Sequence, residues 1–87
     1  INFSLNEIYP NPFNPSTEIN FSNKYFDNIS IKVYDLQGKL VSILSDKYFQ
    51  PGDHSIVWDA QNFSSGSYIV RMQSSNFESS QLITLIK

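Results

Sequence analysis

The residues of this chain that could carry out chemistry are few, and their spacing matches no catalytic arrangement. The 87 residues include one histidine, His54, and no cysteine. Nucleophilic catalysis needs an activated serine or cysteine beside a base, and no Gly-x-Ser-x-Gly turn marks such a nucleophile. His54 shares a predicted strand face with Ile56 and Trp58, where a packed or hydrogen-bonded histidine is typical. The sequence therefore predicts no catalytic residues and a domain that is not an enzyme.

Aspartates are the other candidate ligands, because their oxygens suit hard cations. They lie in or beside predicted turns, where aspartate bonds its own backbone: Asp35, Asp46, Asp53 and Asp59. No Asp-x-Asp-x-Asp-Gly loop is present. We therefore predict no metal site and no cofactor, with incidental calcium binding between loops as the open alternative.

The charge and hydrophobicity of the chain argue against two further classes of function, nucleic-acid binding and membrane spanning. The net charge is −2, and the six basic residues are dispersed: Lys24, Lys32, Lys39, Lys47, Arg71 and Lys87. Nucleic-acid binding requires a basic surface that follows the phosphates, so it has no support here. No apolar run approaches the roughly 20 residues that span a bilayer, and we expect no transmembrane segment. The chain begins at Ile1 without a signal peptide, so we expect it to be cut from a longer protein.

Apolar and polar residues alternate along most of the chain, which is the period of half-buried β-strands. Clusters of turn residues separate the alternating runs, and no helical period appears. We predict seven strands, near 5–9, 17–23, 29–36, 39–48, 53–59, 67–74 and 77–86. This pattern indicates an all-β fold, a single Ig-like antiparallel β-sandwich over 1–87. Within the last strand, 82–86 reads as a more continuous apolar run.

Three of the four prolines fall within six residues, at Pro10, Pro12 and Pro15. Proline fixes its own φ, removes a donor and pushes the preceding residue into extended space. The Pro/Asn-rich segment 9–17 is therefore predicted to be a stiff, extended stretch that precedes the first long strand. Residues 1–8 are predicted to form a linker and a short first strand.

Glycine and aromatic positions refine the fold. Gly38 suits a turn that needs positive φ, and Gly52 follows Pro51 in another turn. The spacing Gly66-x-Tyr68-x-Val70 fits a tyrosine corner, in which a tyrosine near a strand start bonds to upstream backbone. Trp58 is then the expected centre of the core. The alternative is that Tyr68 is one inward aromatic among others and Trp58 an ordinary buried indole.

Other surface signals have ordinary explanations. The four Asn-x-Ser sequons, at Asn2, Asn20, Asn28 and Asn62, are interpreted as chance in an asparagine- and serine-rich chain. Aromatic residues near loops or strand ends are expected mostly to cap the core, with a carbohydrate-binding surface as the alternative: Tyr25, Phe26, Tyr48, Phe49, Phe63 and Phe77.

Several blocks, in order, carry a resemblance to a known family. They are Tyr-Pro-Asn-Pro-Phe-Asn-Pro at 9–15, Val-Tyr-Asp-Leu-Gln-Gly-Lys-Leu-Val at 33–41, Pro-Gly-Asp-His at 51–54, Trp-Asp at 58–59, Gly-Ser-Tyr at 66–68 and the apolar strand that ends in Lys87. Together they resemble the type A C-terminal sorting domain of the type IX secretion system. The chain departs from the family pattern at Ala60, where glycine is frequent, and at Ser80-Gln81, where a basic residue often precedes the last strand.

The resemblance implies a C-terminal sorting signal that directs a cargo protein across the outer membrane of a Gram-negative bacterium, through the periplasm, to the cell surface or medium. The implied partners are the outer-membrane translocon, its shuttle proteins and an upstream cargo domain. The implied recognition residues are Gly66, Tyr68, Leu82, Ile83, Leu85, Ile86 and Lys87. We expect the last strand to offer an open edge that a partner extends by β-augmentation. The alternatives are an Ig-like or fibronectin-III-like spacer and a carbohydrate-binding module on a secreted enzyme.

Overall fold

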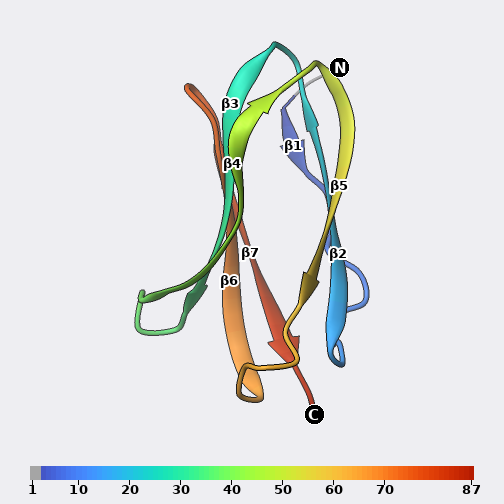
Figure 1. The fold of residues 1–87 in the computed structure, drawn as a ribbon, viewed down its shortest axis with the longest axis vertical. Helices are drawn as coiled ribbons and strands as arrows, with labels where there is room; N and C mark the ends of the chain where they lie inside the picture. The colour runs from blue at the N-terminus through green and yellow to red at the C-terminus, as the bar shows by residue number, and fades with distance from the viewer. Residues whose placement is uncertain (1–2) are drawn as a thin grey trace.

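The computed structural model describes residues 3–87, which form two antiparallel sheets packed face to face (Figure 1). The strands are β1 (Ser4–Leu5), β2 (Ser16–Asn23), β3 (Asp27–Asp35), β4 (Leu40–Phe49), β5 (Gly52–Asp59), β6 (Gly66–Gln73) and β7 (Glu78–Leu85). One sheet has the order β1-β2-β5, and the other has the order β4-β3-β6-β7. The predicted all-β sandwich of seven strands is confirmed. The sequon at Asn2 lies outside the described residues.

The position of β4 distinguishes this sandwich from a constant-type immunoglobulin domain. There the fourth strand joins the sheet of the first, second and fifth. Here β4 pairs with β3 instead, from Asp27 opposite Phe49 to Tyr34 opposite Leu40, with two register shifts. The four-stranded sheet therefore has β4 at one edge and β7 at the other.

The predicted bounds of the last six strands agree with the structure to within two residues, but the first is wrong. Instead of 5–9, β1 covers only Ser4–Leu5, and Tyr9 makes an isolated bridge to Glu18. Between Asn6 and Tyr9 the strand is interrupted, and Ile8 donates its N–H to the side chain of Gln81 on β7. The apolar run 82–86 is buried on one face only, since buried Ile83 and Leu85 alternate with exposed Leu82 and half-buried Thr84.

The core lies between the sheets and is filled by the inward residues of their strands. Its aromatic centre is Trp58, which is 2% exposed and lies 5.4 to 5.6 Å, centroid to centroid, from the rings of Phe13, Phe63 and Tyr68. The other buried apolar residues are Ile8, Ile19, Phe21, Ile29, Ile31, Val33, Ala60, Val70, Met72, Ile83 and Leu85. The prediction that Trp58 is central to the core is confirmed.

Two turns show why glycine stands where it does. Gly38 has a φ of 84° in the turn between β3 and β4, where the Asp35 carboxylate accepts the N–H groups of Gln37 and Lys39, both at 2.9 Å. Gly66 has a φ of 150° at the first residue of β6. A side chain at either position would strain the backbone.

The described residues include no helix that could span a membrane.

Replacing Trp58 tests the aromatic centre. We expect Trp58→Ala to lower the free energy of unfolding by about 3–5 kcal/mol, because the side chain is buried among three rings and leaves a large cavity. Urea denaturation followed by circular dichroism measures this change. Val57→Ala is the matched control, since Val57 is 61% exposed on the same strand, and it should change stability by less than about 0.5 kcal/mol. A similar small effect for both variants would contradict the assignment.

Candidate functional site

The residues predicted for recognition come together at one end of the sandwich, the lower end in Figure 1. In the β6–β7 ladder, Gly66 lies opposite Leu85 and Tyr68 lies opposite Ile83. Lys87 continues past the strand and is fixed to the loop between β5 and β6. Its backbone N–H donates to Ser65 Oγ at 3.1 Å, and its Nζ donates to the carbonyl of Gln61 at 2.5 Å.

Burial divides these residues into two groups. Tyr68, Ile83 and Leu85 are 7%, 0% and 1% exposed, so their side chains face the core. Leu82 and Ile86 are 56% and 53% exposed, and Lys87 is also exposed. Among the seven predicted recognition residues, the side chains that a partner can reach readily are therefore those of Leu82, Ile86 and Lys87, which we call the β7 corner.

Tyr68 forms a tyrosine corner. Its hydroxyl donates to the carbonyl of Ser64 at 2.6 Å, four residues upstream, and its ring packs edge-on against Trp58. The geometry matches the bond expected where the chain turns from the fifth to the sixth strand of an Ig-like sandwich. Of the two explanations that the spacing allows for Tyr68, the structure supports the corner, which fixes the loop that also holds Lys87.

The outer edge of β7 is covered by the Pro/Asn-rich segment 9–17. Phe13 forms a parallel bridge with Leu85: its N–H donates to the carbonyl of Thr84 at 3.0 Å, and its carbonyl accepts the N–H of Ile86 at 2.9 Å. The Phe13 side chain is 3% exposed and packs against Trp58. The segment is thus anchored in the core as well as bonded to the strand.

Two side-chain amides add hydrogen bonds between β7 and the start of the chain. The Asn11 amide covers more of the outer edge of β7, and the Gln81 amide, which belongs to β7, bonds the backbone of residues 5–8. Asn11 accepts the N–H of Thr84 at 3.0 Å and donates to the carbonyl of Leu82 at 3.2 Å. Gln81 accepts the N–H of Ile8 at 2.9 Å and donates to the carbonyls of Leu5 at 3.2 Å and Asn6 at 2.6 Å. An amide carries both a donor and an acceptor, so it can satisfy a strand edge where prolines cannot.

The expectation of an open β7 edge is therefore wrong for 82–86. The N–H of Thr84 and Ile86 and the carbonyls of Leu82 and Thr84 are already bonded to the Pro/Asn-rich segment. A partner strand could add there only by displacing that segment and removing Phe13 from the core. Loss of a buried phenylalanine costs about 3–5 kcal/mol, a large share of the 5–15 kcal/mol that stabilises a typical domain.

Beside the β7 corner is a hollow of about 330 Å³, lined mainly by apolar atoms of Pro10, Pro12, Phe13, Asn14 and Ile86. Two loops lie at the same end of the sandwich. The turn around Leu36 and the loop that contains Ser65 form a second hollow of about 250 Å³, which Gly66 and Tyr68 also line.

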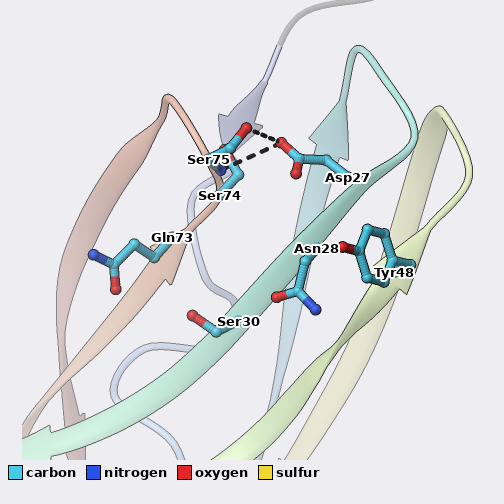
Figure 2. A pocket seen from close by; sticks show the side chains of 7 residues that line it. All are labelled: Asp27, Asn28, Ser30, Tyr48, Gln73, Ser74 and Ser75. Atoms are coloured by element: carbon cyan, nitrogen blue, oxygen red, sulfur yellow. Dashed lines mark hydrogen bonds between the residues drawn. The ribbon is translucent and has the colours of Figure 1, made fainter.

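The opposite end of the sandwich carries a polar hollow of about 370 Å³ (Figure 2). It is lined by Asp27, Asn28, Ser30, Tyr48, Gln73, Ser74 and Ser75. The Asp27 carboxylate accepts hydrogen bonds from the N–H and hydroxyl of Ser75, at 3.3 and 2.7 Å. Tyr48 stacks on Phe26, with ring centroids 5.1 Å apart. Within residues 3–87, no three His, Cys, Asp or Glu side chains gather as a metal site would require.

His54 and the loop aromatics have structural positions. The His54 ring lies against Phe21 and Phe49, and its Nε2 is 2.7 Å from the carbonyl of Gln50, which confirms a packed and hydrogen-bonded histidine. Phe49, Phe63 and Phe77 pack against the core as expected, whereas the rings of Tyr25, Phe26 and Tyr48 are more than half exposed.

The architecture defines a class before it defines a family: a single antiparallel β-sandwich of seven strands within the described residues. The family model described as the secretion system C-terminal sorting domain matches residues 7–86, and the chain belongs to this family. It is a C-terminal sorting signal of type IX secretion, a kind of domain that is not itself catalytic. Such a signal implies a cargo protein and delivery to the cell surface or medium. The search of curated proteins finds no significant match.

Removing the Tyr68 hydroxyl tests the tyrosine corner. We expect Tyr68→Phe to destabilise the domain by about 1 kcal/mol, because a net hydrogen bond to backbone is lost while the ring remains. Thermal or urea unfolding measures the change. Tyr48→Phe is the matched control, since Tyr48 is 61% exposed, and it should be nearly neutral. Equal effects of the two variants would show that the bond to Ser64 adds no stability.

Removing the Asn11 amide tests the closed edge. In Asn11→Ala, we expect the amide of Thr84 to exchange with solvent about tenfold faster, because net hydrogen-bond contributions of about 0.5–1.5 kcal/mol each are lost. Hydrogen exchange followed by NMR measures this rate at each residue. Asn20→Ala is the control, since in the described part of the chain the Asn20 side-chain amide bonds only to the Glu18 carboxylate, at 3.4 Å. Unchanged exchange at Thr84 would show that the amide does not protect the edge.

Proposed function

We propose that this domain delivers its cargo by presenting the β7 corner to the type IX outer-membrane translocon and its shuttle proteins. The cargo would pass through the periplasm of a Gram-negative bacterium and be anchored on the cell surface. The family assignment over 7–86 carries the proposal. No observation favours a structural spacer or a carbohydrate-binding module.

The exposure of their side chains suggests two different roles for the seven predicted recognition residues. Leu82, Ile86 and Lys87 would contact the partner, because their side chains are exposed within 82–87. Leu82 and Ile86 are apolar, and interaction sites present exposed apolar side chains. The other four residues would maintain the structure of this surface. Buried Ile83 and Leu85 would hold β7 in register, and Tyr68 and Gly66 would shape the loop that fixes Lys87.

A charge at the β7 corner tests the proposal. In the full cargo protein, we expect Leu82→Asp to reduce the amount at the cell surface by about tenfold and to leave the protein in the periplasm, because about 1.4 kcal/mol of lost docking energy gives that factor. Surface proteolysis and fractionation measure the distribution. Ile43→Asp is the matched control, since Ile43 and Leu82 are both 56% exposed.

The control variant separates recognition from general surface effects. Ile43→Asp should be exported as the unchanged protein is, and both variants should keep the melting temperature of the domain. If folded Leu82→Asp is exported normally, the β7 corner is not the recognition surface. If both variants fail equally, added surface charge rather than this corner is responsible.

A further inference from the structure

The Pro/Asn-rich segment and the end of β7 form one continuous surface, although they are far apart in sequence. Asn11 and Thr84, which are bonded to each other, are 73 positions apart. The apolar hollow beside the β7 corner takes Pro10, Pro12, Phe13 and Asn14 from the segment and Ile86 from the end of β7. Neither part makes the hollow alone, so it exists only when the sandwich has closed.

The hollow is rigid on both sides. The prolines fix their own φ, and the carbonyl of Pro10 accepts the hydroxyl hydrogen of buried Thr17 at 2.7 Å. Phe13 is anchored against Trp58 and bonded to Thr84 and Ile86. A surface that is already ordered loses little conformational entropy on binding, so contacts made there yield more affinity.

The residues that line the hollow indicate that it would accept an apolar group. No charged residue lines it, and its accessible lining is mostly apolar. The hollow is shallow and open to solvent, with a volume of about 330 Å³, so it would hold one side chain of a partner rather than enclose a small molecule. Protein interfaces place an aromatic or aliphatic anchor from one partner in such a pocket on the other.

We propose that this hollow is the second half of the sorting signal and receives one apolar side chain from the type IX machinery. This inference rests on the proposed function and extends it, because Ile86 belongs to both the β7 corner and the wall of the hollow. The occupant is a protein side chain because the hollow is continuous with the corner through which the sorting domain would dock. The signal is then a folded surface made of two distant segments rather than a linear tail.

Filling the hollow tests this inference. Asn14 lines it, is exposed, and makes no side-chain hydrogen bond within residues 3–87, so a larger residue fits there without disturbing the core. In the full cargo protein, we expect Asn14→Arg to lower surface delivery about tenfold, a loss equivalent to about 1.4 kcal/mol, by placing a long charged side chain over an apolar site. Asn76→Arg is the matched control, because Asn76 is an exposed asparagine in the turn between β6 and β7, at the opposite end.

Two further measurements make every outcome informative. Hydrogen exchange at Thr84 reports whether the segment remains bonded to β7, and Asn14→Asp adds a charge with little added volume. Reduced delivery by both Asn14 variants, with slow exchange at Thr84 and normal delivery of Asn76→Arg, supports the proposal. Normal delivery of folded Asn14→Arg overturns it.

The result for Leu82→Asp distinguishes the two proposals. If Asn14→Arg is delivered normally while Leu82→Asp is not, the hollow has no role and recognition reads only the β7 corner. If both are delivered normally, the corner and the hollow are both excluded. If Asn76→Arg fails as severely as Asn14→Arg, the effect belongs to surface charge and the hollow is excluded as its cause.

Discussion

The rest of the structure depends on closure of the β7 edge by a segment from the other end of the chain. An edge strand normally presents unpaired N–H and carbonyl groups, which invite pairing with any exposed strand. Here the backbone of Phe13 and the side-chain amide of Asn11 satisfy those groups from Leu82 to Ile86. The same contacts fix the position of Ile86 and join the two sheets at one side. Along 82–86, a partner would therefore meet side chains rather than unpaired backbone groups.

The aromatic core connects this closed edge to the rest of the recognition end. Trp58 touches Phe13 on one side and Tyr68 on another, so the Pro/Asn-rich segment and the tyrosine corner share one packing centre. Tyr68 in turn fixes the loop through Ser64, and Ser65 of that loop holds Lys87. One cluster of aromatic rings therefore positions elements from the first, middle and last parts of the sequence. A substitution in that cluster would change the shape of the recognition surface as well as the free energy of unfolding.

Strand period, turn residues and the Gly66-x-Tyr68 spacing predict six strands, the tyrosine corner and the role of Trp58, because these depend on local alternation and conformational preference. The course of residues 6–13 follows from none of these. An asparagine or glutamine amide that replaces backbone pairing looks, in sequence, like any other polar residue, and its partners lie more than 70 positions away. The split of 82–86 into buried and exposed side chains likewise depends on which face of β7 meets the core. For these reasons the sequence does not predict the closed edge or the apolar hollow.

The length of the sandwich has a consequence for the protein that carries it. The described part of the molecule extends 37 Å along its longest axis, and β1 begins near the end opposite Lys87 (Figure 1). The described chain therefore begins and ends at opposite ends of the sandwich. A cargo domain joined ahead of β1 would be attached away from the surface that includes Ile86, so one sorting module of this form would be sterically compatible with cargo domains of different size.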